Sequence, residues 1–350
     1  MMIDYIIVGY GIAGLSFAFK LIKEKKDFVI IDTSETNSTF QSGAVLNPTI
    51  LKRYTISWKG SDFLKFAKKF YVEFENEYNV KVFDKIVIHR YFSRKQEQND
   101  WIVASGLKPL ENYLDHQVIN EDNDTILLKN GFGILKNTAK IYPKLLLDTF
   151  KFNLTKNNFI NKKFDYKKLE IFKQYVKYGN FKSKKIVFCE GVGIKNNIFF
   201  NYLPIESLKG EYLLIKSPKL SSKYILKSSI YIIPLEKKVF WVGSTFDFND
   251  KSQKKTKKGY NFLLSKLNSF ISVPFEVIDH EIGFRPVVKD RRPILGRHPK
   301  YENLILYNGL GTRGLMLAPL LSKWLYEYTS DNKEFYKEIS INRYKDLYKN

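Results

Sequence analysis

The sequence predicts an α/β protein in which a doubly wound parallel sheet is combined with an antiparallel sheet. Two observations predict the parallel sheet. An apolar run leads into a glycine turn and a helical pattern at the N-terminus, and the same order returns after residue 304. The antiparallel sheet is predicted by strand-like runs over 210–216, 224–234 and 239–245, which follow one another with no helix between them.

The N-terminal unit carries a glycine motif in a defined context. Residues 5–8 form an apolar run of strand type, and the turn Gly9-Tyr10-Gly11-Ile12-Ala13-Gly14 follows directly. A helical pattern runs over 13–23, and residues 28–31 form a second strand that ends at Asp32. A G-x-G-x-x-G motif between a strand and a helix predicts a dinucleotide-binding site.

The residues of this unit have separate physical roles. Gly9 lets the chain turn tightly out of the strand, Gly11 leaves room for a pyrophosphate, and Gly14 lets the helix pack close to the strand. The helix N-terminus offers N–H groups and a positive dipole end to phosphates. Asp32 lies at the spacing of the acid that binds a ribose hydroxyl, and its charge would repel a 2′-phosphate. The unit therefore predicts FAD or NAD rather than NADP, and leaves those two open.

Two later segments are further candidates for cofactor contact. The loop over 39–48 is rich in small residues and could bring backbone N–H groups of Ser42, Gly43 and Ala44 to a cofactor, although a plain loop is an equal interpretation. Residues 185–189 form a buried-type strand that ends at Glu190-Gly191, which resembles another strand-to-glycine turn of the parallel sheet.

The remaining elements are predicted from apolar spacing. Helices are expected over 61–78 and from about residue 142, and a strand over 80–88. The length of 350 residues suits two interlocked domains better than a single core.

The balance of charge leaves two interpretations. A formal net charge of +22 attracts phosphates and suggests contact with nucleic acid. The lysines are spread along the chain, however, which equally indicates a general compositional bias. The basic clusters over 182–185 and 254–258 are expected to be solvated loops.

Arginine is distributed differently from lysine. The chain has 49 lysines and nine arginines, and five of the arginines lie between Arg285 and Arg313. A planar guanidinium holds a carboxylate or phosphate through two parallel hydrogen bonds, so this segment is a candidate anion-binding region. Chance and surface ion pairs are the alternative explanation.

Several classes of protein are not expected. The single cysteine, Cys189, excludes an internal disulfide and a cysteine-based zinc site, and its place in a strand predicts a small core residue rather than a reactive thiol. The four histidines show no paired spacing, so no metal is expected. No apolar stretch is long enough to span a bilayer, and the N-terminus lacks a signal-peptide pattern. We therefore expect a cytoplasmic protein.

The C-terminal part carries the motifs of a known family. The run over 283–299 begins Gly283-Phe284-Arg285-Pro286, and a strand over 304–307, the turn over 309–314 and a helical pattern over 315–328 follow. With Lys209-Gly210-Glu211, Tyr231–Pro234 and Val242–Thr245, the sequence resembles the D-amino-acid oxidase (DAO) family of FAD-dependent oxidoreductases over nearly its whole length. It is most similar to glycine oxidases and to the oxidoreductase domain of the bifunctional enzyme that modifies the wobble uridine of tRNA.

The resemblance implies a Rossmann-like FAD-binding domain interleaved with an antiparallel-sheet (α+β) substrate domain. The first would comprise 1–78, 142–207 and 281–350, and the second 79–141 and 208–280. It also implies FAD held without a covalent bond. Relatives with covalent flavin attach it through a cysteine near the Arg-Pro segment, and this chain has none there.

The resemblance further implies roles for three predicted catalytic residues. Arg285 would hold the carboxylate of the substrate, and Tyr231 would lie over the substrate near the flavin. Arg313 belongs to the turn that would surround the flavin ring, and the dipole of the next helix would stabilise reduced, anionic flavin. The predicted cofactor-binding residues are Gly9, Gly11, Ile12, Ala13, Gly14, Asp32, Ser42, Gly43, Ala44, Gly191, Gly309, Gly311, Thr312, Arg313, Gly314 and Leu315.

Two activities stay open at this point. The turn over 309–314 departs from the His-Phe-Arg-Asn-Gly of glycine oxidases and is closer to the tRNA enzyme, which is normally fused to a methyltransferase for which this length leaves no room. The first hypothesis is oxidation of a small amine or amino acid. The second is removal of a carboxymethyl group from a carboxymethylaminomethyl side chain of a wobble uridine. A protein that binds FAD without catalysis is a third, and the substrate, the electron acceptor and the oligomeric state are left open.

Overall fold

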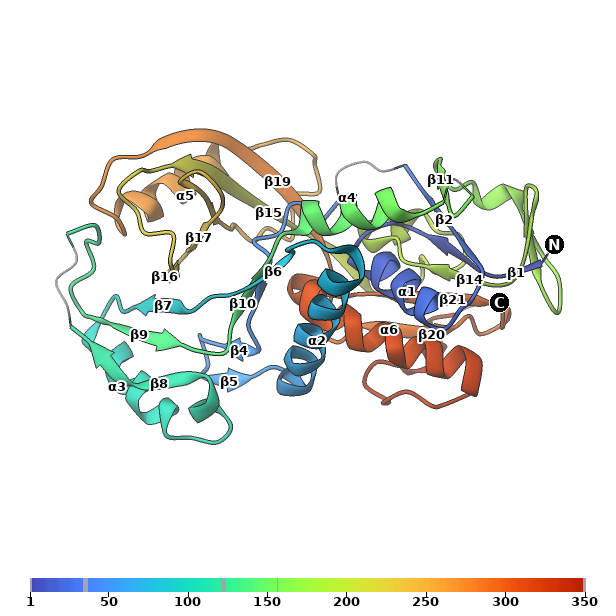
Figure 1. Cartoon of the computed structure of the whole chain (residues 1–350), viewed down its shortest axis with the longest axis horizontal. Helices are drawn as coiled ribbons and strands as arrows, with labels where there is room; N and C mark the ends of the chain where they lie inside the picture. Colours follow the sequence, from blue (N-terminus) through green and yellow to red (C-terminus); the bar gives the residue numbers. More distant parts are fainter. Residues whose placement is uncertain (1, 34–36, 121–123, 156, 349–350) are drawn as a thin grey trace.

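The computed structural model describes residues 2–33, 37–120, 124–155 and 157–348, and it contains two sheets of eight strands each. Figure 1 shows these sheets at opposite ends of an elongated molecule, with both chain termini beside the first sheet. The mixed α/β class predicted from the sequence is confirmed.

The first sheet is mainly parallel. Its strand order is β11-β2-β1-β14-β13-β12, and β21 also pairs with β14 and carries β20 on its other side. Neighbours among β11, β2, β1, β14 and β21 run parallel, as the strand-turn-helix pattern predicts. The bounds are β1 Met2–Val8, β2 Phe28–Asp32, β11 Phe159–Asn161, β12 Leu169–Ile171, β13 Val176–Tyr178, β14 Phe181–Phe188, β20 Ile294–Arg297 and β21 Leu304–Asn308.

Four helices pack beside the first sheet and share its largest buried cluster. Apolar side chains at helical spacing on α1 and α2 face this cluster, which is why these segments fold as amphipathic helices. Two short 3-10 helices, η3 and η4, follow β14 and β21. The bounds are α1 Ile12–Lys23, α2 Gly60–Tyr78, α4 Pro143–Asn153, α6 Gly314–Asp331, η3 Gly191–Asn196 and η4 Gly311–Arg313.

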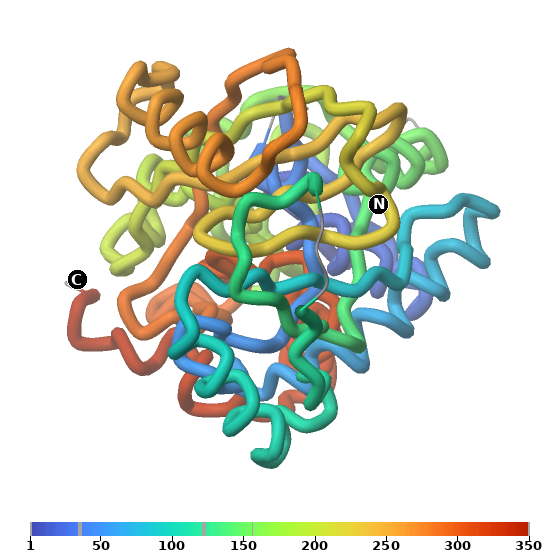
Figure 2. The backbone as a smooth tube through the Cα atoms, turned by 90° about the vertical axis from the view of Figure 1, so that its left-hand side faces the viewer, coloured from blue at the N-terminus to red at the C-terminus, as the bar shows by residue number. Residues whose placement is uncertain are grey.

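The second sheet has the order β19-β15-β18-β17-β16-β7-β9-β8, and all its neighbours are antiparallel except β16 and β7. Figure 2 looks onto this end of the molecule, with yellow and orange segments above the teal ones. Helix α5 covers one face of the sheet, and α3 packs against β8. The bounds are α3 Lys95–Ser105, α5 Lys257–Asn268, β7 Ile88–Tyr91, β8 Leu114–Ile119, β9 Phe132–Leu135, β15 Ile205–Lys216, β16 Ile225–Lys227, β17 Tyr231–Pro234, β18 Val239–Gly243 and β19 Glu276–Val288.

Two small sheets connect the ends of the molecule. One has the order β3-β10-β6, and the other pairs β4 with β5. Their bounds are β3 Val45–Leu46, β4 Thr49–Ile50, β5 Thr55–Ile56, β6 Phe83–Lys85 and β10 Ala139–Ile141. The predicted domain boundaries stay a prediction, and two long strands bear on them. β15 begins before residue 208 and β19 continues beyond 281, and both belong to the second sheet over their whole length.

Three predictions about single segments are wrong. The expected strand over 224–234 is a hairpin, because the chain reverses at Ser228, whose N–H donates to the carbonyl oxygen of Ile230 (3.0 Å). The expected strand over 80–88 is divided between β6 and β7, which join different sheets. The lysines over 182–185 lie in β14 rather than in a loop, because pairing with β1 continues through them while Lys184 reaches Asp4 (2.8 Å) at the surface.

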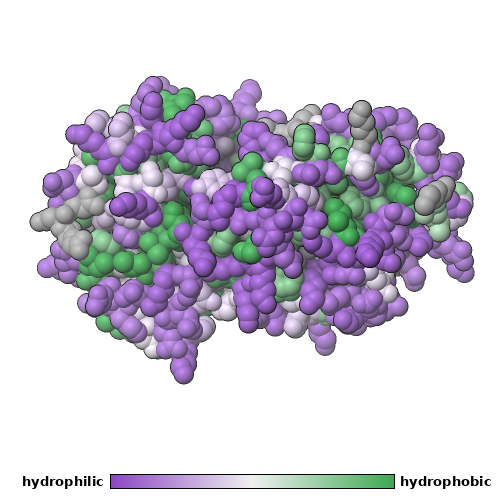
Figure 3. All heavy atoms as spheres, in the orientation of Figure 1, coloured by the Kyte–Doolittle hydropathy of each residue, from purple (hydrophilic) through white to green (hydrophobic). Residues whose placement is uncertain are grey.

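The surface is largely polar, in agreement with the many charged residues in the sequence. Most of the face in Figure 3 is hydrophilic. Among the described residues, no helix is both long and apolar enough to cross a bilayer.

Candidate active site

The N-terminal turn needs glycine at two positions. Gly9 has φ +101°, and a Cβ on it would lie 2.6 Å from the carbonyl oxygen of Cys189. A Cβ on Gly14 would lie 2.1 Å from the carbonyl oxygen of Gly9. At Gly11 the nearest atom to an added Cβ is Thr39 Oγ1 at 3.3 Å. The turn is therefore tight on its protein side and less crowded at Gly11, where a ligand would approach.

Helix α1 begins at this turn with its N–H groups directed toward the loop after β2. The Ile12 N–H donates to Thr39 Oγ1 (3.0 Å), and the first turn, which includes Ala13, holds no acidic residue. The N-terminal N–H groups of a helix have no acceptor within it, and they carry its positive dipole end. Asp32 ends β2 beside them and accepts from the backbone N–H groups of Tyr10 (2.5 Å) and Thr33 (2.7 Å).

A second acid lies beside Asp32 that sequence reasoning missed. Glu190 follows β14, and its carboxylate accepts from the Tyr166 hydroxyl and from Asn197 Nδ2 (2.7 Å). Burial raises the pKa of Glu190 to about 7, and the charge of Asp32 acts in the same direction. Unlike Asp32, Glu190 does not follow the G-x-G-x-x-G motif at a characteristic spacing, so the sequence carries no signal for it. Only the parallel pairing of β14 with β1 reveals its position.

The other predicted glycine turns converge on the same region. Gly191 and Gly311 have φ +54° and +59°, and the nearest atoms to an added Cβ lie on Pro286 (4.0 Å) and Val287 (3.8 Å). An added Cβ at either glycine would therefore have no protein atom closer than 3.8 Å. The Asn308 side chain donates to the Gly191 carbonyl oxygen (2.9 Å) and ties the two turns together.

The end of this C-terminal turn meets the start of α1. A Cβ on Gly314 would lie 3.3 Å from Ile12 Cγ2, while one on Gly309 would lie 2.9 Å from Val288 Cγ2. Thr312 is exposed, and the carbonyl oxygen of the buried Leu315 accepts from the Tyr71 hydroxyl (2.7 Å). Of the predicted residues here, Gly314 lies against Ile12 of the N-terminal motif, and Leu315 is a buried residue in the first turn of α6.

The loop with Ser42, Gly43 and Ala44 touches the second sheet. Ser42 Oγ donates to the Thr39 carbonyl oxygen (2.9 Å), so this hydroxyl is used within the loop. A Cβ on Gly43 would lie 2.6 Å from Ile233 Cδ1 of β17, and Ala44 is buried with φ +53°. Gly43 thus brings the loop over 39–48 against the sheet that holds Tyr231.

Arg285 belongs to the second sheet rather than to the glycine turns. It lies on β19, and its guanidinium covers Gly210 of β15, where a Cβ would be only 2.3 Å from Nη1. Nη2 donates to Ser244 Oγ (2.6 Å), and the Phe246 ring centre is 5.0 Å from Cζ. Nη1 is buried without a hydrogen-bond partner among the described residues, and burial lowers the Arg285 pKa to about 10. Such a donor needs an acceptor, and a carboxylate fits it.

Tyr231 and Arg313 meet at one short loop. The phenol of Tyr231 hydrogen-bonds the Asn47 side chain, and Arg313 Nη2 donates to the Thr49 carbonyl oxygen (3.0 Å). Asn47 Oδ1 accepts from the N–H (2.9 Å) and hydroxyl (2.8 Å) of Thr49. Burial raises the pKa of Tyr231 and lowers that of Arg313. Tyr231 is also paired with Gly243, the residue before Ser244, so the three predicted catalytic residues lie in one region.

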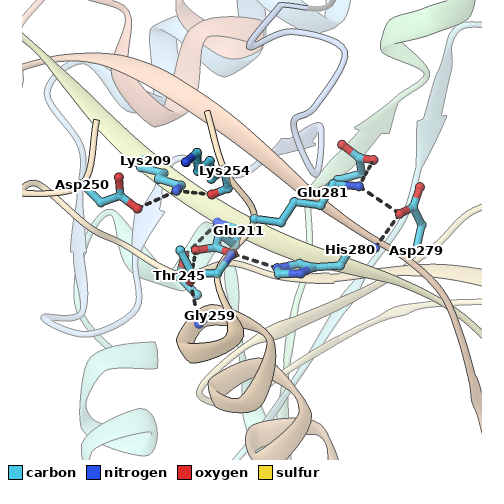
Figure 4. A network of polar contacts seen from close by, with 11 residues as sticks. Lys209, Glu211, Thr245, Asp250, Lys254, Gly259, Asp279, His280 and Glu281 are labelled. Carbon is cyan, nitrogen blue, oxygen red and sulfur yellow. Dashed lines mark hydrogen bonds and ion pairs between the residues drawn. The ribbon is translucent and has the colours of Figure 1, made fainter. Parts of the chain in front are cut away.

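A polar cluster surrounds Lys209 and Glu211, the neighbours of Gly210 on β15 (Figure 4). Lys209 and Glu211 flank Gly210 and point away from the guanidinium. Lys209 is 1% exposed, and its Nζ lies 2.6 Å from Asp250 Oδ2 and 2.5 Å from the Lys254 carbonyl oxygen. Glu211 accepts from Thr256 N (2.9 Å) and Oγ1 (2.6 Å), and it lies 2.8 Å from His280 Nε2.

The cluster fixes the segment that contacts Arg285. Thr245 Oγ1 accepts from the Glu211 N–H (2.7 Å), and Asp247 exchanges two backbone hydrogen bonds with Lys209 (2.9 and 3.0 Å). Ser244 and Phe246 alternate with these residues and face the guanidinium instead. The Lys209-Gly210-Glu211 motif therefore leaves room for Arg285 on one face and anchors its partners from the other.

No group of three or more metal-ligating side chains occurs within the described ranges. The region combines two arginines, the Tyr231 phenol, two acids and glycine turns.

Comparisons with known proteins agree with this geometry. A family model described as DAO, FAD dependent oxidoreductase, matches residues 4–328. The glycine oxidase of Bacillus subtilis is 25% identical over 163 residues, which cover 41% of this chain and 44% of that protein. The bifunctional tRNA 5-methylaminomethyl-2-thiouridine biosynthesis protein of Campylobacter fetus is 24% identical over 360 residues, covering 90% of this chain and 54% of that protein.

The chain thus spans about half the length of these curated relatives. Among solved structures, the glycine oxidase of Bacillus cereus superposes with a TM-score of 0.79 at 15% identity, covering 95% of this chain and 96% of that chain. This likeness supports the fold.

Proposed function

Because the chain belongs to the DAO family of FAD-dependent oxidoreductases, we propose that it oxidises the C–N bond of a small amine that carries a carboxylate, such as glycine or an N-substituted glycine. The observation that carries this proposal is Nη1 of Arg285, a buried guanidinium donor without a hydrogen-bond partner in the described structure. Its neighbour Nη2 is already oriented by Ser244.

The residues present suit FAD, the cofactor of this family. The less crowded approach at Gly11 and the N-terminus of α1 suit the pyrophosphate, and Asp32 suits a ribose hydroxyl. Gly191 and Gly311 leave room for the rest of the molecule. When bound, FAD supplies the acceptor for the two electrons removed from the substrate. We propose that it is held without a covalent bond, since the single cysteine, Cys189, is buried.

The protein side of the reaction is binding and orientation. Arg285 would hold the carboxylate in a partly buried place, where a charged hydrogen bond is stronger than in water. Tyr231, kept in position by Asn47, would pack against the substrate. Arg313 would add positive charge beside the phenol. In this arrangement Arg285 contributes mainly to substrate affinity, and Tyr231 and Arg313 to the geometry of the reacting carbon.

The test is the visible spectrum of the purified holoenzyme without oxygen, before and after sarcosine or glycine is added. Bleaching of the flavin band is expected with the wild type and should require a much higher substrate concentration in Arg285→Ala. A flavin band that persists with all carboxylated amines, in a protein with full flavin content, would contradict the proposal.

A second candidate is removal of the carboxymethyl group from a carboxymethylaminomethyl-uridine in tRNA. It is favoured by the net charge of +22 and by the Campylobacter fetus relative, which aligns with 90% of this chain. The same spectral experiment with tRNA that carries the modified uridine separates the two. Bleaching by this tRNA at micromolar concentration, with sarcosine inert, would replace the first candidate by the second.

A further inference from the structure

The second sheet carries a lysine beside Tyr231 that no part of the proposed function uses. Lys227 is the last residue of β16, and the strand register places it opposite Tyr231 of β17 on one side and Arg90 of β7 on the other. Directly paired residues of neighbouring strands present their side chains on the same face of a sheet. Lys227 and Arg90 therefore share a face with Tyr231, and Leu226 lies on the opposite face in the core under α5.

The charge of Lys227 has no acidic partner. Its Nζ lies 4.5 Å from the Tyr231 ring centre and donates to the carbonyl oxygens of Ser228 (2.7 Å) and Ser229 (3.3 Å). Across the described part of the chain, no carboxylate lies within 4.0 Å of this nitrogen. An ammonium has three donors, so two are used by carbonyl groups and one is left.

The charge of the neighbouring Arg90 is paired with a carboxylate, whereas that of Lys227 is not. Arg90 Nη2 lies 3.4 Å from Glu97 Oε2, and both side chains are largely buried. Burial lowers the pKa of Lys227 to about 7, Arg90 acts in the same direction, and Glu97 opposes it. Burial without a carboxylate beside it disfavours the charged form of Lys227, and an anionic ligand at this nitrogen would favour that form again.

Lys227 and Arg285 lie on opposite sides of Tyr231 in the order of the strands, because Tyr231 pairs with Lys227 on one side and with Gly243, next to the Arg285 partner Ser244, on the other. β16 and β15 are separated by β17 and β18, so their backbones are about 14 Å apart at the usual strand spacing. The Lys227 ammonium lies over the Tyr231 ring, and the Arg285 guanidinium lies over Gly210 and donates to Ser244. A small molecule that lies along Tyr231 with an acid at each end would therefore have one basic side chain for each acid.

We propose that Lys227 is a second anion-binding group of the substrate site and that the preferred substrate is a secondary amine with two carboxylates. Its glycine unit binds at Arg285, its nitrogen lies by Tyr231, and the acid of its other arm binds at Lys227. The inference rests on the proposed function only for the identity of the reacting bond. The arrangement of charges applies to binding whether or not oxidation follows.

The test measures binding without turnover. Diglycolate and methoxyacetate have the shapes of iminodiacetate and sarcosine, with an ether oxygen in place of the oxidisable amine. Titration of the holoenzyme with each, followed by the flavin difference spectrum, gives Kd for the diacid and the monoacid. We expect diglycolate to bind about tenfold to a hundredfold more tightly than methoxyacetate, the range of one charge-assisted hydrogen bond.

The variant Lys227→Met should remove this preference by weakening diglycolate, with methoxyacetate changed less than about twofold. Lys227→Arg should retain part of the preference, and Lys223→Met, at an exposed position of the preceding turn, should retain all of it. Equal affinity of the two acids for the wild type, or an equal loss of both in Lys227→Met, would overturn the proposal.

Anaerobic mixing with iminodiacetate and sarcosine then tests the proposed function separately. Failure of both amines to bleach the flavin, with the diglycolate preference intact, would overturn the oxidation but leave the diacid site standing. Bleaching by both amines with no dependence on Lys227 would do the reverse.

Discussion

The cofactor end and the substrate end of this site are built in opposite ways. The cofactor end is made mostly of backbone: two glycines at which a methyl group would collide, the first turn of α1, and Asp32. The proposed substrate end would consist of side chains from β16, β17, β19 and the segment after β18. We infer that a single added methyl group in the glycine turn prevents cofactor binding altogether. At the proposed substrate end, affinity for the substrate should fall in steps as each charged side chain is removed.

The largest effect is expected from Gly14→Ala. The added methyl group would lie 2.1 Å from the Gly9 carbonyl oxygen, and α1 must move away from β1 to relieve the collision. We expect the loss of bound flavin and a loss of about 3 kcal/mol in the free energy of unfolding. Flavin content after gel filtration and a denaturant titration measure both.

Gly179→Ala is the matched control, because its φ is also positive (+55°) and no atom lies within 4 Å of an added Cβ. It should cost about 1 kcal/mol and keep the flavin. Full flavin content in Gly14→Ala would show that the turn is not the rigid unit described above.

The next effect concerns Arg285→Met at the substrate end. Losing the buried guanidinium should lower kcat/KM for a carboxylated amine by about 30-fold to a few thousandfold, or about 2–5 kcal/mol. Flavin content should stay at the wild-type level, because Arg285 contacts Ser244 and Phe246 rather than the glycine turns. Arg285→Lys should recover little, since an ammonium cannot form two parallel bonds to a carboxylate. Flavin loss in Arg285→Met would contradict the separation of the two ends.

Glu190→Gln tests the acid beside Asp32 whose pKa is raised by burial. Its folded-state pKa of about 7 lies above its ordinary value of 4.5, so ionisation is disfavoured in the folded protein. Below about pH 4.5 the carboxyl is protonated in both states, and stability is then lost as the pH rises toward 7. The substitution should therefore stabilise the protein at pH 8 by at most about 3 kcal/mol and change little at pH 4.5.

Thermal unfolding of wild type and Glu190→Gln across this pH range checks the prediction. Glu206→Gln is the control, because the Glu206 side chain is 54% exposed. A stabilisation that is equal at both ends of the range would mean that Glu190 does not titrate between them.

The smallest effect on catalysis is expected from substitution of Lys209, which contacts the segment that carries Ser244. Lys209→Met removes the ion pair with Asp250 and loosens the segment that carries Ser244, so KM should rise about fivefold with kcat nearly unchanged. Asp250→Asn should act in the same way with less disturbance of the core. Lys255→Met, which breaks the exposed pairs with Asp279 and Glu281, should leave KM unchanged. A fall in kcat without a change in KM would contradict a positioning role.

The sequence alone was sufficient for the parts of the molecule that are contiguous in the chain. The run from Gly9 to Gly14 carries its own strand, turn and helix signals, so the α/β class and the dinucleotide-type turn follow from local pattern. The position of Arg285 in Gly-Phe-Arg-Pro came from a family resemblance rather than from periodicity. Arg285, Tyr231 and Arg313 nevertheless lie in one region of the structure, as that resemblance implies.

The tertiary structure alone decided what lies next to what across the second sheet. Lys227 seemed an ordinary lysine inside an expected strand over 224–234, and only the hairpin at Ser228 places it opposite Tyr231. Burial raises the pKa of Glu190, and the charge of Asp32, which comes from another part of the chain, acts in the same direction. Strand pairing and burial depend on residues far apart in sequence, whereas a glycine turn depends on six neighbours. That is why the glycine turn could be predicted from the sequence, whereas the surroundings of Lys227 and Glu190 could not.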